Sequence, residues 1–129
     1  MPLTLAEADV HITKALAKAQ HMRVLISCAV VDEFGELVQV DRMDGASPMT
    51  VDIAEAKAIT ALNFRCPTSN LLSMEPHVLD SLKQAVRFNV IPLAGGVPIL
   101  VQGMAIGAIG VSGATSDQDE EIATAAVCQ

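Results

Sequence analysis

The chain has 129 residues, and we expect residues 1–129 to form a single domain with its own hydrophobic core. Its net charge of −7, the absence of any Lys/Arg cluster and the lack of Trp and Tyr argue against nucleic acid as a partner. No apolar run reaches the roughly 20 residues of a membrane-spanning helix, and the N-terminus lacks the features of a secretory signal, so we expect a cytoplasmic protein that binds no membrane.

The composition also bears on self-association and on redox compartment. Hydrophobic residues make up 51% of the chain and charged residues 18%, whereas globular domains average about 25% charged residues. A small surface with so little charge favours a homo-oligomer, a dimer or a larger assembly. Cys28, Cys66 and Cys128 are widely spaced and form no CxxC pair, which indicates a reducing compartment and no disulfide framework or zinc site.

The first half of the chain predicts a helix followed by a hairpin. Residues 4–21 repeat apolar side chains at helical spacing, and Thr4 and Glu7 form the T-x-x-E pattern of a capping box. The apolar, β-branched run 24–31 predicts a buried strand, and 36–42 predicts the strand that returns. Gly35 can adopt the positive φ that closes the tight turn between them.

The second predicted helix begins at Ser47 or Pro48 and runs to about Phe64. It is apolar almost all round, and Lys57 projects from one of its apolar sides. A helix with two apolar sides is covered on both. We expect the sheet to cover one side and a neighbouring subunit to cover the other.

The second half predicts short helices over 68–74 and 76–85, a strand piece at 91–93, and a hairpin of strands 97–101 and 104–112. Gly107 and Gly110 in the last strand indicate close approach by another element. Thr115 or Ser116 caps a final helix. Two hairpins with helices between them predict a largely antiparallel sheet with helices packed on it.

Three stretches together resemble the GlcG/HbpS-like family, which includes the C-terminal domain of PduO-type proteins. They are Val30-Val31-Asp32 through Gly35 to Arg42-Met43-Asp44-Gly45-Ala46; Ala54-x-x-Lys57-Ala58-x-Thr60-Ala61-x-x-Phe64 with Pro67-Thr68; and Gly95-Gly96-Val97-Pro98-Ile99 with 106–113 and Gln118-Asp119-Glu120.

The resemblance implies an α+β, profilin-like fold, in which a five-stranded antiparallel sheet lies between helices in a three-layer α/β/α arrangement. It also implies assembly into dimers or larger rings. Some relatives bind heme, so heme is the cofactor that the resemblance implies. Others are encoded beside glycolate, diol or aromatic catabolic enzymes. The ligating positions differ among the members that bind heme.

A heme site needs an axial ligand beside an apolar slot. His77 is a candidate because it follows Pro76 in a loop-rich stretch, and the alternative is a solvated loop histidine. His21 is a candidate because it lies near the first strand, where some PduO-type relatives present a ligand. Its alternative role is a favourable charge at the end of the first helix. His11 is expected on the exposed flank of that helix, and Met43 is expected to be a core or loop methionine.

A polar cluster offers a second kind of site. Arg42 and Asp44 end the second strand, Lys57 leaves an apolar helix side, and Gly95-Gly96 offers free backbone N–H groups. A desolvated Lys beside such donors can clamp a carboxylate or stabilise an oxyanion. The alternative is an ion pair of Lys57 with an Asp or Glu inside a subunit interface.

The last helix begins with a further candidate. Thr115 is either a helix cap or, as in heme-binding relatives, a residue close to the pocket. The acidic run 117–121 is expected to be a solvated helix start.

Three functions follow as hypotheses. The first is a binding protein that holds heme or another small anionic, apolar ligand within a homo-oligomer. The second is a small enzyme acting on a hydroxy-acid catabolite, with Lys57 and Asp44 in proton transfer or anion binding. The third is an accessory subunit that binds a partner enzyme. The sequence contains no Ser/His/Asp signature, phosphate-binding glycine loop or H-x-x-H pair.

Overall fold

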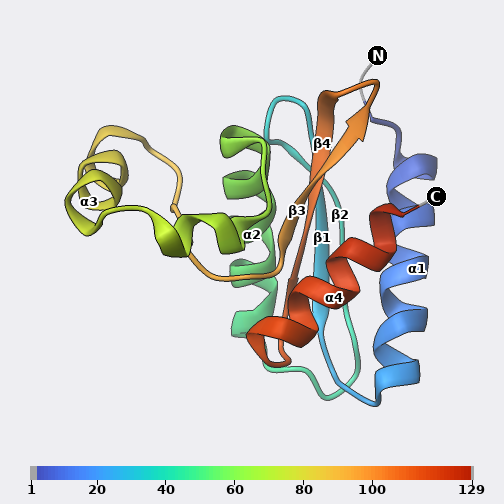
Figure 1. Ribbon diagram of the computed structural model, residues 1–129. Coiled ribbons are helices and arrows are strands. Elements are labelled where there is room, and N and C mark those ends of the chain that lie inside the picture. The colour runs from blue at the N-terminus through green and yellow to red at the C-terminus, as the bar shows by residue number, and fades with distance from the viewer. Residues whose placement is uncertain (1–2, 129) are drawn as a thin grey trace.

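The computed structural model describes residues 3–128, and Figure 1 shows a sheet with helices on both of its faces. Its four strands are all antiparallel and lie in the order β2-β1-β4-β3. The predicted α+β class with an antiparallel sheet is confirmed, but the expectation of five strands is wrong, because residues 3–128 form four. They are β1 Ser27–Asp32, β2 Leu37–Arg42, β3 Gly96–Val101 and β4 Met104–Ser112.

The strand predicted at 91–93 is absent because side chains satisfy its backbone groups. Pro92 has no N–H to donate to a ladder. The Ile91 N–H donates to Thr60 Oγ1 at 3.1 Å, and Leu93 O accepts from Thr68 Oγ1 at 2.5 Å. Two threonines therefore hold this segment as an extended connection that joins no sheet.

Helices α1 (Leu5–Met22) and α4 (Ser116–Val127) cover one face of the sheet, and α2 (Met49–Phe64) covers the other (Figure 1). The 3₁₀ helix η1 (Thr68–Ser73) and α3 (Pro76–Ala85) extend away from the sheet beyond α2. Helix α3 contains no buried residue. None of the helices formed by residues 3–128 is long and apolar enough to cross a membrane.

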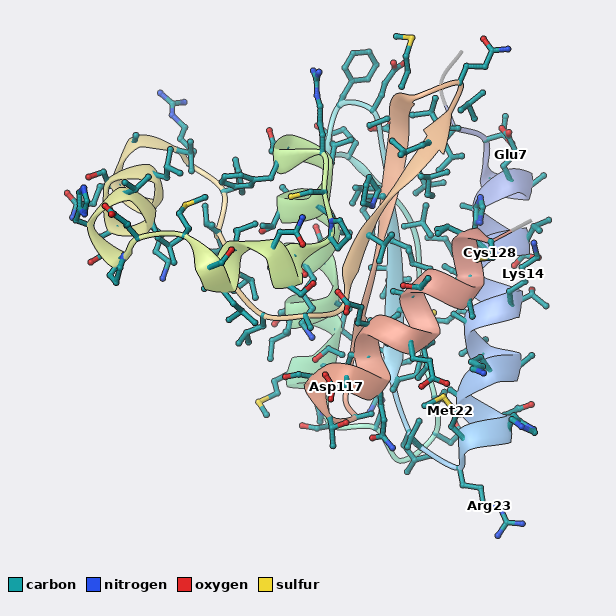
Figure 2. The ribbon with its side chains drawn as sticks, viewed as in Figure 1. Glu7, Lys14, Met22, Arg23, Asp117 and Cys128 are labelled. Carbon is teal, nitrogen blue, oxygen red and sulfur yellow. The ribbon has the colours of Figure 1, made fainter. Side chains whose placement is uncertain are left out.

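The predicted capping box at the start of α1 is confirmed. Glu7 N donates to Thr4 Oγ1 at 3.1 Å, and Thr4 N donates back to Glu7 Oε1 at 3.0 Å. Helix α1 also holds the C-cap residue of α4, because Lys14 Nζ donates to Cys128 O at 3.1 Å; Figure 2 labels both residues where the end of α4 meets α1. The face that α1 buries consists of Ala8, Ile12, Ala15 and Ala19.

Glycine lets α2 approach β4 closely. A Cβ atom at Gly110 would overlap Ala54 O and lie 2.7 Å from Ala58 N, and one at Gly107 would overlap Val31 O. The close approach predicted at both glycines is confirmed. The backbone of α2 therefore lies against the sheet itself, which fixes the height of Lys57 above β4.

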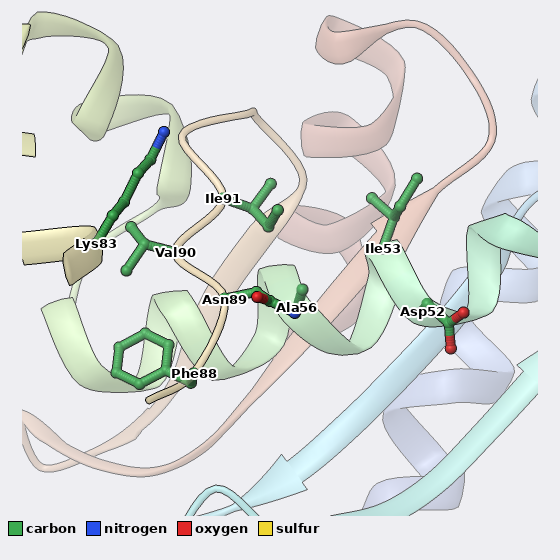
Figure 3. A pocket seen from close by; sticks show the side chains of 8 residues that line it. All are labelled: Asp52, Ile53, Ala56, Lys83, Phe88, Asn89, Val90 and Ile91. Carbon is green, nitrogen blue, oxygen red and sulfur yellow. The ribbon is translucent and has the colours of Figure 1, made fainter. Parts of the chain in front are cut away.

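The chain itself covers part of the second apolar side of α2. The connection from α3 to β3 returns across this helix, and Thr60 Oγ1 donates to Asn89 O at 3.2 Å. Figure 3 shows the hollow of about 340 Å³ that remains between α2 and this connection, with Ile53 and Ala56 on one wall and Phe88 on the other. The chain itself therefore covers part of the side on which a neighbouring subunit was expected, and the rest of that side remains open.

Candidate functional site

Lys57 is the charged side chain that α2 buries, with 3% of the residue exposed. Its Nζ atom donates to Val111 O in β4 at 2.9 Å and to Asp119 Oδ2 in α4 at 3.1 Å. A buried ammonium group needs such partners, because removing its hydration costs several kcal/mol. The ion pair that the sequence left as the alternative for Lys57 thus forms within the chain, with Asp119.

Asp119 is also buried, at 3% exposure, so the expectation of a solvated acidic run is wrong at this position. Its Oδ1 atom accepts from Ala114 N at 3.0 Å. Burial raises the pKa of the Asp119 carboxyl above its ordinary value, and the neighbouring Lys57 opposes that rise. The pair is therefore a carboxyl and an ammonium group in contact with each other and largely shielded from water.

Gly95 and Gly96 lie against Lys57, as the predicted cluster required. Gly95 has φ +128°, and a Cβ atom there would lie 2.8 Å from Lys57 Nζ, so a side chain would displace the ammonium group. The Gly96 N–H is not free as expected, because it donates to Thr68 Oγ1 at 2.9 Å. The contribution of the two glycines is space for the Lys57 side chain.

The Lys57–Asp119 pair lies at the bottom of an open cavity of about 500 Å³, which we call the Lys57 cavity. Exposed or half-buried apolar side chains and four hydroxyl residues line it together with the ion pair. The apolar residues are Leu25, Met49, Ile53 and Leu93, and the hydroxyl residues are Ser47, Thr50, Ser112 and Ser116.

Arg42 and Asp44 do not reach this cavity. They line a different hollow of about 620 Å³ beside Leu16 and Gln20 of α1. Arg42 Nη1 donates to Ala46 O at 3.0 Å, which ties it to the loop before α2. The predicted polar cluster is therefore divided: Lys57, Gly95 and Gly96 come together, whereas Arg42 and Asp44 lie elsewhere.

Thr115 caps α4. Its Oγ1 accepts from Gln118 N at 3.3 Å, and Gln118 Oε1 accepts from Thr115 N at 3.1 Å. Its neighbours Ala114 and Ser116 line the Lys57 cavity, and Thr115 does not. The cap, one of its two predicted roles, is confirmed.

The histidines lie away from the cavity. His77 is exposed in the first turn of α3, where its Nδ1 lies 3.2 Å from Glu75 Oε2, and His21 is exposed in the last turn of α1. His11, expected on an exposed flank, is instead half-buried, with Nδ1 2.8 Å from Ala126 O. Within residues 3–128, no three His, Cys, Asp or Glu side chains are grouped to hold a metal ion.

The sulfur-containing candidates have structural positions. Cys28 is buried in β1, and burial raises the pKa of its thiol to about 12, as suits an unreactive core residue. Met43 Sδ accepts from Ile26 N at 3.4 Å. Met49, in contrast, is 65% exposed and lines the Lys57 cavity, although no sequence motif marks it as a site residue.

Comparison with known proteins adds a family and several relatives. Residues 3–128 match the family described as "Haem degrading protein HbpS-like". A Citrobacter freundii protein from the dhaT-dhaS intergenic region is 34% identical over 127 residues, which cover 97% of this chain and 89% of that protein. Corrinoid adenosyltransferase PduO of Salmonella typhimurium is 30% identical over 130 residues, and the match covers 98% of this chain but 39% of PduO.

Two solved structures share the arrangement of strands and helices. A PduOC:heme complex has a TM-score of 0.89 and 27% identity, covering 98% of this chain and 94% of that chain. A double mutant of HbpS from Streptomyces reticuli has a TM-score of 0.89 and 35% identity, covering 98% of this chain and 86% of that chain.

Proposed function

Because the chain belongs to the HbpS-like family, we propose that it binds heme or a closely related tetrapyrrole. The observation that carries this proposal is the heme complex of a relative that superimposes on 98% of the chain with a TM-score of 0.89.

We place the ligand in the Lys57 cavity because its chemistry matches both parts of a tetrapyrrole. Met49, Leu25 and Leu93 are 65%, 50% and 47% exposed, and together they offer apolar surface at one opening. Large apolar side chains gathered around a hollow are typical of ligand sites. The buried Lys57 ammonium group in the same cavity suits the carboxylates at one edge of the macrocycle.

The cavity offers few side chains that could coordinate the heme iron. Among residues 3–128, no histidine lines the Lys57 cavity, and Met49 is the lining residue whose side chain type can ligate heme iron. Bound heme would supply redox and axial-ligand chemistry. Met49 and Leu93 would contact the macrocycle and exclude water from the surface that they cover.

Hemin titration of the purified protein tests this proposal. We expect a Soret shift that saturates at one hemin per chain. Iron-free protoporphyrin IX, titrated in parallel, separates the contribution of the iron from that of the macrocycle and its carboxylates. A spectrum of free hemin throughout the titration contradicts the proposal.

The Lys57–Asp119 pair also favours a second candidate, the small enzyme acting on a hydroxy-acid. Asp44 lies in the other hollow, so Asp119 replaces it as the proposed partner of Lys57 in proton transfer. Buried, paired titratable groups in an open cavity are typical of acid–base sites. Turnover of a hydroxy-acid that Asp119→Asn abolishes, with the fold intact, would support this candidate.

We also propose self-association, for which the turns at one end of the sheet offer a surface. Phe34 in the β1–β2 turn is 77% exposed, and Met104 and Leu100 in the β3–β4 hairpin are 72% and 51% exposed. All three line one hollow of about 360 Å³. Light scattering on Phe34→Asp should show a smaller assembly than the parent protein, and an unchanged mass would contradict this surface.

A further inference from the structure

We infer that the lower part of the Lys57 cavity binds a carboxylate group, held by the Ser112 hydroxyl, the Lys57 ammonium group and the start of α2. This inference deepens the proposed function, on which it rests for the identity of a large ligand. The same carboxylate chemistry has two possible sources, a propionate of a tetrapyrrole or a free small acid.

Ser112 is a buried donor that faces the cavity. The residue is 6% exposed and lines the cavity, and within residues 3–128 its hydroxyl forms no hydrogen bond. Ser27 lies directly opposite it in the pairing of β1 with β4, and the Ser27 hydroxyl is 2.8 Å from Thr50 Oγ1. The Ser27 hydroxyl thus has a hydrogen-bond partner within the protein, whereas the Ser112 hydroxyl can hydrogen-bond to a ligand.

Helix α2 presents an uncapped start to the same cavity. Its N-cap residue is Pro48, which has no side chain able to accept from the first turn, whereas α1 and α4 both begin with complete capping boxes. Thr50 Oγ1 is directed away from the first-turn N–H groups and donates to Ser47 O at 2.6 Å. The Thr50 and Val51 N–H groups already donate to Ser47 O and Pro48 O, so what this 16-residue helix offers an anion is the positive end of its dipole.

The charges of the cavity permit an anion. The ammonium group of Lys57 and the carboxylate of Asp119 cancel, so the charged side chains that line the cavity have no net formal charge, and the first turn of α2 lines the cavity as well. Lys57 Nζ has three N–H donors, of which Val111 O and Asp119 Oδ2 use two. The third can donate to a ligand oxygen without breaking the ion pair.

The test compares ligands that carry or lack the carboxylate. Hemin and hemin dimethyl ester are titrated by Soret absorbance in the same co-solvent, and glycolate and methyl glycolate are titrated by NMR chemical-shift perturbation. We expect hemin to bind about tenfold or more tightly than its ester, and glycolate to shift the amides around Ser112 whereas methyl glycolate does not.

Ser112→Ala is the test variant, and Ser81→Ala, which removes an exposed hydroxyl from α3 outside the Lys57 cavity, is the matched control. Both changes are small enough to leave the fold intact. We expect Ser112→Ala to weaken hemin or glycolate about tenfold, with no effect of Ser112→Ala on hemin dimethyl ester and no effect of Ser81→Ala on any ligand.

The outcomes separate the two proposals. Glycolate binding that depends on Ser112, without hemin binding, keeps the carboxylate site and overturns the proposed heme function. Equal affinity for hemin and its ester, with no response to glycolate or to Ser112→Ala, overturns the carboxylate site and keeps heme binding.

Discussion

Lys57 Nζ lies 3.1 Å from Asp119 Oδ2, and the two side chains are 4% and 5% exposed. One belongs to α2 and the other to α4, so this ion pair joins the helices that cover opposite faces of the sheet. The Lys57 cavity opens where the two helices begin.

Removing one member of the pair should be costly. Lys57→Met leaves the Asp119 carboxylate buried without its counter-charge, and breaking a buried pair in this way typically costs about 3–5 kcal/mol. The double variant Lys57→Met/Asp119→Leu should regain most of that loss, because neither buried charge remains. Urea unfolding of both variants measures this, and a single variant as stable as the parent would contradict the role of the pair.

The pH dependence of stability should carry the signature of Asp119. Burial raises the folded-state pKa of this carboxyl, so above the ordinary value of 3.8 the folded protein retains a proton that the unfolded chain has lost. This contribution to stability is complete below that value and declines as the pH rises through the folded-state pKa. When urea unfolding is measured across that pH range, the free energy of unfolding of Asp119→Asn should lack this decline. If the parent protein and Asp119→Asn show the same pH dependence, the role of Asp119 is refuted.

Gly95 should tolerate no side chain. Gly95→Ala combines a φ of +128° with a Cβ atom 2.5 Å from Val111 O and 2.8 Å from Lys57 Nζ, so we expect a loss of stability of about 3 kcal/mol. Gly103→Ala is the matched control, because Gly103 also has a positive φ of +78° but has no atom within 4 Å of such a Cβ. For Gly103→Ala we expect a loss of about 1 kcal/mol from the backbone conformation alone. Equal losses in thermal unfolding would mean that the contacts of this Cβ with Val111 and Lys57 do not matter.

The rim of the Lys57 cavity should govern affinity for hemin. Leu93→Asp places a charge where the disc is proposed to lie, and burying an unpaired charge should weaken hemin binding tenfold or more, about 1.4 kcal/mol. Leu72→Asp introduces the same charge at a 64% exposed site in η1, outside the cavity. Titration should find only the first variant impaired. Equal behaviour of the two would move the ligand away from this rim.

Local sequence patterns predicted the parts of the fold that depend on local chemistry. The Thr4–Glu7 capping box, the turn at Gly35 and the β3–β4 hairpin all follow from residues within a few positions of one another, and the structure has them all. The strand expected at 91–93 failed because its fate depends on Thr60 and Thr68, more than 20 residues away in the sequence.

Only the part of the site that depends on local sequence patterns could be predicted. A lysine in an apolar helix requires a counter-charge, and that signal correctly selected Lys57 and an acidic partner. It could not choose Asp119, which looks like any other acidic residue at a helix start and is buried through contacts 62 residues apart. Ser112 and Met49 carry no local signal, because only the packing of α2 on β4 places them at one cavity.

The hydrogen bond from Gly96 to Thr68 has a consequence for how copies of this protein meet. Strand β3 is an outer strand of the sheet, and such strands invite foreign strands to extend the sheet into aggregates. Here the Gly96 donor is occupied by Thr68, and Pro98, two residues further along, has no donor to offer. These two positions of β3 therefore offer no free backbone donor through which another chain could extend the sheet, although the sequence is rich in alanine and valine.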